Sequence, residues 1–199
     1  MKSIKNKEFF SKGKRGFIYV GMIGAKKVAI KTKNPRSKAV GRIENEANWL
    51  KKLNKKGIGP KFVEFKNDNL VYEFAEGEFI LDWLINKDKS SIKEVLKAIF
   101  MQCRELDKLK VNKEEMHNPI KHIVVGTTIT LLDFERCKKT EKPQNVTQFC
   151  QFVMSKKLKT ILSKKGIRVN NKKLIKLLKE YKKDYSEKKF NEALKMVMG

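Results

Sequence analysis

The stretch I-T-L-L-D-F-E-R-C, which covers Ile129–Cys137, is the part of the sequence from which the fold is inferred. Its β-branched and leucine residues, Ile129–Leu132, predict a short buried strand, and Asp133 follows directly at the strand end. A carboxylate held rigidly at a strand end is suited to binding a metal ion. Alternatively, Arg136 neutralises Asp133, and the carboxylate serves only the stability of the fold.

Two upstream segments supply residues that go with such a carboxylate. V-A-I-K, Val28–Lys31, predicts a second apolar strand that delivers one lysine. Apolar residues at helical spacing then predict a helix over residues 39–53, with Glu46 beside its apolar face. Glu44 is the rival, but at 100° per residue it projects about 200° away from Glu46. Only one of the two can face inward, and the spacing to the apolar face favours Glu46.

The order Lys31, Glu46, Asp133 resembles the protein-kinase-like superfamily over roughly residues 9–155. The resemblance is to its small atypical branch: the RIO-type kinases, the small kinase of the KEOPS complex, and lipopolysaccharide-kinase-like proteins. It implies an archaeal-type Ser/Thr kinase with an α+β, minimal bilobal fold. The N-lobe would be an antiparallel sheet with one helix, and the C-lobe would be small and helical.

The expected lobes divide the chain at residue 75. Residues 1–75 would hold the sheet and the helix 39–53, and residues 76–199 a catalytic hairpin at 122–133 and two C-terminal helices. The strands expected in the N-lobe are Phe9–Lys12, Phe17–Met22, Lys27–Lys31, Phe62–Lys66 and Asn69–Phe74.

The turn between the first two strands contains Gly13 and Gly16. Their backbone amides could approach the phosphates of ATP, as in a kinase glycine-rich loop, with Lys14 and Arg15 adding positive charge. The family pattern has three glycines and this turn has two. An ordinary hairpin turn is the alternative.

The stretch L-V-Y-E-F-A-E-G resembles the strand that runs into the kinase hinge. The resemblance implies that Tyr72 is the gatekeeper and that the backbones of Glu73 and Ala75 bond the adenine. The alternative is a plain antiparallel hairpin.

The segment after a long helix, Ser91–Lys110, replaces the family motif H-R-D-L-x-x-x-N. Aligned from the helix side, K-E-E-M at Lys113–Met116 replaces H-R-D-L, so Glu115 takes the place of the catalytic base. Aligned from the strand side, His122 takes the metal-binding Asn place. The two alignments disagree by two residues, and His117 is the rival base.

The implied metal set is Asp133, His122 and Asn118. Magnesium prefers oxygen ligands, so the amide oxygen of Asn118 is the alternative to the His122 nitrogen. Lys121 could neutralise a γ-phosphate. After Asp133, Glu135 stands where typical kinases have glycine, and no A-P-E segment follows. The sequence therefore lacks a regulated activation loop.

The remaining helices show apolar stripes with polar residues near their starts. Expected caps are Ser90 or Ser91 with Glu94 for the long helix, and Asn145 or Thr147 for the next. Gly166 would end one C-terminal helix, and Asn170 or Asn171 would cap a second.

The chain is strongly basic, with 47 Lys and Arg against 22 Asp and Glu and a net charge of +25. Such a surface favours nucleotide phosphates, RNA, ribonucleoprotein or acidic proteins as partners. Solvated lysines of a heat-adapted protein are the alternative.

Three cysteines without a CxxC pair argue against a disulfide framework or a zinc site and favour a reducing, cytoplasmic location. No apolar run approaches the roughly 18 residues of a membrane span.

We expect an ATP- and Mg²⁺-dependent phosphotransferase acting on Ser or Thr of a protein or of itself. Lys31 would hold the phosphates, Glu46 would orient Lys31 through an ion pair, Asp133 would bind Mg²⁺, and Glu115 would be the base. One alternative is a nucleotide-binding factor of ribosomal or tRNA machinery that transfers little phosphate. The other is a basic nucleic-acid-binding protein with no nucleotide site, in which these residues would be scattered.

Overall fold

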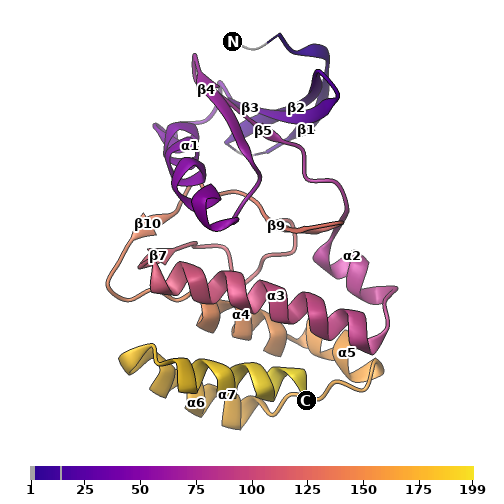
Figure 1. The fold of residues 1–199 in the computed structure, drawn as a ribbon, viewed down its shortest axis with the longest axis vertical. Helices are drawn as coiled ribbons and strands as arrows, with labels where there is room; N and C mark the ends of the chain where they lie inside the picture. Colours follow the sequence, from indigo (N-terminus) through magenta and orange to yellow (C-terminus); the bar gives the residue numbers. More distant parts are fainter. Residues whose placement is uncertain (1–2, 14) are drawn as a thin grey trace. The chain divides into compact units, whose positions relative to one another are not determined.

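The computed structural model describes residues 3–13 and 15–199 and has an α+β fold. These residues form ten strands, seven α-helices and one 3-10 helix (Figure 1). The chain divides into two compact units. The first comprises the residues up to Glu76 together with Thr130–Cys137, and the second comprises Gly77–Ile129 and Lys138–Gly199.

The first unit is built on a five-stranded antiparallel sheet with the order β1-β2-β3-β5-β4. The strands are β1 (Lys5–Lys12), β2 (Gly16–Ile23), β3 (Lys26–Lys33), β4 (Phe62–Lys66) and β5 (Asn69–Glu73). All five expected strands are present, and the first three are longer than expected. Asn67 and Asp68 join β4 to β5 with φ values of 50° and 56°. A two-residue hairpin needs this left-handed geometry, which Asn and Asp tolerate.

Helix α1 (Arg42–Leu53) packs on β3, β4 and β5 and is followed by the 3-10 turn η1 (Asn54–Lys56). We expected the helix to begin at residue 39, which was wrong by three residues. Gly41 precedes the helix with φ 67°, a left-handed conformation that cannot continue a right-handed helix. The apolar face buries Ile43, Ala47 and Leu50, as its periodicity predicted.

The segment Thr130–Cys137 clusters with the first unit, although we expected it in the second. Side chains of helix α1 donate hydrogen bonds to the backbone of this segment. Asn45 Nδ2 donates to the carbonyl oxygens of Glu135, at 3.0 Å, and Cys137, at 3.1 Å. Trp49 Nε1 donates to the Cys137 oxygen at 2.8 Å. Side chains of α1 thus replace the strand partners that these carbonyls would otherwise need.

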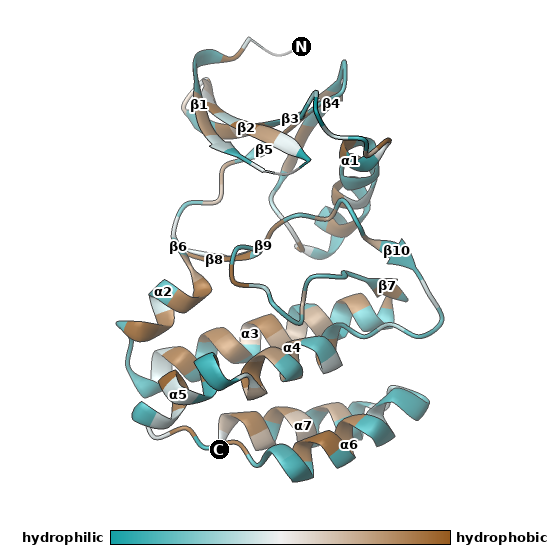
Figure 2. Ribbon diagram, turned by 180° about the vertical axis from the view of Figure 1, so that it is seen from behind, coloured by the Kyte–Doolittle hydropathy of each residue, from teal (hydrophilic) through white to brown (hydrophobic). Residues whose placement is uncertain are grey.

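The second unit is mainly helical. Its elements are β6 (Glu78–Phe79), α2 (Ile80–Ile85), α3 (Lys89–Lys108), β7 (Val111–Asn112), β8 (Ile123–Val125), β10 (Lys138–Lys139), α4 (Asn145–Met154), α5 (Lys156–Lys164), α6 (Asn171–Asp184) and α7 (Glu187–Met198). Strand β9 (Ile129–Leu131) carries the chain into the first unit. Helix α3 packs against α4 and α7, and apolar residues run along α3 and α4 (Figure 2).

Two of the expected helix caps are wrong. Asp88, and not Ser90 or Ser91 with Glu94, caps α3, because its carboxylate accepts from the backbone N–H groups of both serines. Helix α4 begins after Gln144 without a side-chain cap. Asn170 does cap α6, accepting from Lys173 N at 3.1 Å.

Each of the two expected C-terminal helices is a pair of helices. Ser155 has an extended conformation, ends α4, and caps α5 by accepting from Leu158 N. Tyr185, with φ 51°, separates α6 from α7. Neither break carries a glycine or proline, which is why the apolar periodicity gave no sign of them.

Within the described part of the chain, no helix combines the length and the apolar character required to cross a membrane. Cys103, Cys137 and Cys150 are buried and form no disulfide with one another. Cys103 is a completely buried core residue of α3.

Candidate active site

Lys31 is the centre of a buried charge cluster in the first unit. It lies on β3, opposite Ile18 of β2 and Leu70 of β5, and its side chain is 9% exposed. Its Nζ donates to three carboxylates at 2.6, 3.1 and 3.1 Å: those of Glu46, Asp133 and Glu135, respectively. The three carboxylates that contact this amine lie 15 to 104 positions from Lys31 in the sequence.

Glu46 approaches from α1 and is almost completely buried, whereas Glu44 is exposed. The predicted ion pair with Lys31 is confirmed, and so is the choice of Glu46 over Glu44. The second carboxylate oxygen of Glu46 accepts from the backbone N–H of Phe134 at 3.1 Å. Glu46 therefore ties the lysine strand to the segment that follows β9.

Asp133 follows β9 in a left-handed conformation with φ 65°, which for a residue other than glycine stores on the order of 1 kcal/mol of strain. This turn places its carboxylate beside Lys31, 102 positions away in the sequence. The side chain is 30% exposed, so it is open to solvent while one oxygen is held. Phe134, with a fully buried ring, anchors the turn.

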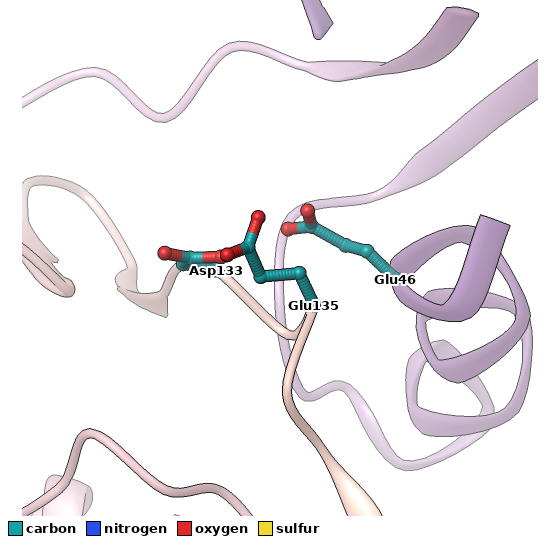
Figure 3. A group of neighbouring side chains, drawn as sticks. All are labelled: Glu46, Asp133 and Glu135. Carbon is teal, nitrogen blue, oxygen red and sulfur yellow. The ribbon is translucent and has the colours of Figure 1, made fainter. Parts of the chain in front are cut away.

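Glu135 is the member of the cluster that sequence reasoning missed. Its Oε2 accepts from Lys31 at 3.1 Å, and its Oε1 accepts from Arg15 Nη1 at 2.6 Å. Glu135 lies in a turn after the left-handed Asp133, so the alternation of an extended strand does not predict where its side chain points, and no local signal in the sequence indicated it. Figure 3 shows Asp133 and Glu135 side by side after β9, with Glu46 reaching toward them from α1.

The cluster shifts the ionisation of its members. Burial alone would lower the pKa of Lys31, but the charges of Glu46, Asp133 and Glu135 outweigh it and hold that pKa well above 10.5. Lys31 therefore stays charged at neutral pH. Burial raises the pKa of Glu46; Lys31 opposes this shift, while Asp133 adds to it. The three carboxylates around the Lys31 ammonium repel one another, and this repulsion is an electrostatic cost of the cluster.

The donor set fits a hard divalent cation. One oxygen from each of Glu46, Asp133 and Glu135 lies within 4.8 Å of the others. Carboxylate oxygens are the ligands that magnesium prefers. Among the three, Asp133 is the most open to solvent, and it is therefore the side chain best placed to reach an ion shared with a bound molecule.

The glycine turn lies against this cluster. A Cβ on Gly16 would come within 2.7 Å of the Thr32 oxygen and 3.6 Å of the Lys31 side chain, so only glycine fits. The N–H of Gly13 donates to the Gly16 oxygen at 2.8 Å and closes the turn on itself. The Gly13 N–H, which we expected to approach the phosphates, is therefore already engaged in a hydrogen bond within the turn. Lys14 lies outside the described residues.

The expected adenine-binding residues are on and after β5. Tyr72 is half-buried; burial, followed by the charge of Glu46, raises the pKa of its hydroxyl. The N–H of Glu73 already donates to the Lys61 oxygen at 2.8 Å. The backbone groups left for hydrogen bonds to adenine in this hypothesis are therefore the Glu73 carbonyl and the Ala75 peptide. Adenine binding here stays a prediction.

The remaining predicted site residues belong to the second unit. Lys113 is fully buried, with Nζ 3.5 Å from Glu115 Oε2. His117 and Asn118 are exposed, and His122 is half-buried. The roles expected for these residues toward ATP, magnesium and a hydroxyl group stay predictions.

A buried polar network fixes the start of the K-E-E-M segment. Asn145 Oδ1 accepts from the N–H of Lys113 at 2.8 Å, and its Nδ2 donates to the Val111 oxygen at 2.6 Å and to Asp107 Oδ1 at 2.8 Å. Tyr181 donates its hydroxyl to Asp107 Oδ2 at 2.8 Å. Burial raises the pKa of Asp107, while these donors oppose the shift. We expected Asn145 to be a helix cap; it is instead a bridge between separated segments.

A comparison with models of protein families finds no match for this sequence. A search of curated proteins also finds no relative. Functional inference therefore depends on the chemistry of the site itself.

Proposed function

We propose that the protein is an ATP- and Mg²⁺-dependent phosphotransferase of the kinase-like kind, acting on a Ser or Thr hydroxyl. The single observation that carries the proposal is the convergence of Lys31, Glu46 and Asp133 in the first unit. The three were selected by motif alone, from positions spread over about a hundred residues. A basic protein with no nucleotide site gives no reason for them to meet.

In this proposal Lys31 exchanges part of its carboxylate contacts for the phosphates of ATP. Glu46, buried and bonded to both Lys31 and the Phe134 N–H, keeps the lysine aimed at the cluster. Asp133, the most exposed acid of the three, would hold Mg²⁺. Bound magnesium would neutralise phosphate charge during transfer.

The finer fold assignment belongs to the same proposal: the two units are the two lobes of a minimal kinase-like fold. Tyr72, Glu73 and Ala75 would then meet the adenine. Glu115 would accept the proton of the hydroxyl group. A protein substrate is the expected acceptor, and the net charge of +25 favours one associated with RNA or ribonucleoprotein.

A nucleotide-binding factor with little transfer is the second candidate. K-E-E-M in place of H-R-D-L and Glu135 in place of glycine favour it, because both changes fall where kinases keep fixed residues. Turnover separates the candidates. Radiolabelled γ-phosphate transferred to the protein or to a basic acceptor supports the phosphotransferase. Magnesium-dependent ATP binding without transfer supports the second candidate.

A further inference from the structure

The carboxylate of Glu135 bridges two cations, Arg15 of the glycine turn and Lys31 of strand β3. One oxygen lies 2.6 Å from Arg15 Nη1 and the other 3.1 Å from Lys31 Nζ. Its side chain is 4% exposed, whereas that of Arg15 is 34% exposed. Arg15 belongs to the glycine turn, whose Gly16 lies against the Lys31 side chain. The carboxylate of Glu135, itself an oxyanion, therefore already occupies the place where this turn and Lys31 meet.

A phosphate group can bind the same two cations that the Glu135 carboxylate binds. Both are oxyanions that take charge-assisted hydrogen bonds from arginine and lysine, and arginine matches either one with its forked donors. A phosphate bound between Arg15 and Lys31 would need the donors that Glu135 now uses. Glu135 and a phosphate thus compete for the same cations.

We infer that Glu135 is an internal competitor for phosphate that makes nucleotide binding depend on a divalent cation. This inference rests on the proposed function, because it concerns the same site. Three carboxylates face two cations, so the cluster is net negative when all five groups are ionised. A phosphate chain that arrives without a metal ion meets this charge. A divalent cation on the carboxylates frees Arg15 and Lys31 for the phosphates.

Two contacts hold the backbone of Glu135 in place. Asn45 Nδ2 holds its carbonyl oxygen at 3.0 Å, and the neighbouring Phe134 is fully buried. We therefore place the change on phosphate binding at the side-chain contacts. The exposed member of the pair, Arg15, is the group that changes partner when phosphate binds.

Calorimetric titration with ATP and with inorganic triphosphate, each in EDTA and in magnesium, tests the inference. In Glu135→Gln we expect metal-free affinity for both probes to rise about tenfold, since one charge is removed beside the phosphate. Affinity in magnesium should change by less. The matched control is Glu64→Gln, which removes a charge from half-buried Glu64 on β4 of the same unit and should leave both affinities unchanged.

The double variant Arg15→Gln, Glu135→Gln separates competition from a structural role. If Glu135 competes for Arg15, the gain seen in Glu135→Gln is lost when Arg15 is absent, whatever happens to the melting temperature. Metal-free affinity equal in the wild type and Glu135→Gln, with normal magnesium-dependent binding, would overturn this inference alone. No binding of either probe by any variant in any condition would overturn the proposed function as well.

Discussion

Replacing Lys31 by methionine removes the cation on which three carboxylates converge, and its effect on stability can be worked out from the structure. Nζ lies within 3.1 Å of all three acids. Breaking a buried pair by removing one partner costs about 3–5 kcal/mol. The lower end, about 3 kcal/mol, applies here because Asp133 is 30% exposed and water screens its charge. We expect this loss in the free energy of unfolding near pH 8.

The loss should shrink as the pH falls. Burial already raises the pKa of Glu46, and Lys31 holds that pKa down. Without Lys31 it rises further above its unfolded value of about 4.3. The folded variant then binds more protons than the unfolded chain, so its stability increases as pH falls through the raised pKa toward the unfolded one. Urea denaturation at about pH 8 and about pH 5.5 measures the difference, with buried Trp49 as a fluorescent reporter.

Lys27→Met is the matched control, because Lys27 is an exposed lysine on the same strand. It should change stability by less than about 0.5 kcal/mol at either pH. A Lys31→Met variant as stable as the wild type at pH 8, or equally destabilised at both pH values, would refute the electrostatic account of the cluster.

Two further predictions concern the second unit. Glu115→Gln should lower phosphate transfer while leaving ATP affinity nearly intact, because Glu115 is expected to meet only the acceptor hydroxyl; unchanged turnover in a transfer assay would shift the base to His117. Asn145→Ala should destabilise the protein by about 2–3 kcal/mol in urea denaturation, because it removes hydrogen bonds to Asp107, Val111 and Lys113 and leaves buried groups without partners. A loss below about 0.5 kcal/mol would show that the network is not needed for stability.

The first-unit sheet and the inward orientation of Glu46 follow from local patterns in the sequence, whereas the meeting of Lys31, Glu46 and Asp133 was implied by the resemblance to kinase-like proteins. Alternating and apolar runs define strands, and helical spacing selects Glu46 over Glu44. The place of Glu135 in the charge cluster was not predicted, because it depends on Arg15, 120 positions earlier, and no local pattern links the two residues. Typical kinases have a glycine at this position, so the resemblance assigns no side-chain role to it.

The errors in helix boundaries have a related cause. Gly41 starts α1 by its left-handed φ, and Ser155 and Tyr185 end helices without a breaker residue. Glycine adopts a left-handed φ readily, whereas Tyr185 is held by residues distant in the sequence: Arg104 donates to its carbonyl oxygen, and its hydroxyl donates to the Pro143 oxygen. Asn145 reads as a cap in the sequence, but it binds Asp107 and Val111, partners that only the folded chain supplies.

The central claim is that Asp133 holds a magnesium ion between the protein and ATP. Its direct test is the thermal unfolding of Asp133→Asn with and without Mg²⁺ and an ATP analogue. Asp82→Asn, at an exposed position on α2, is the control. We expect both ligand-free proteins to fold, since Asn is nearly isosteric with Asp. The magnesium-dependent stabilisation by nucleotide should be abolished in Asp133→Asn and kept in the control. An Asp133→Asn protein that unfolds more easily without ligand, yet keeps the full nucleotide-induced shift, would contradict the claim and make Asp133 a structural partner of the cations around it.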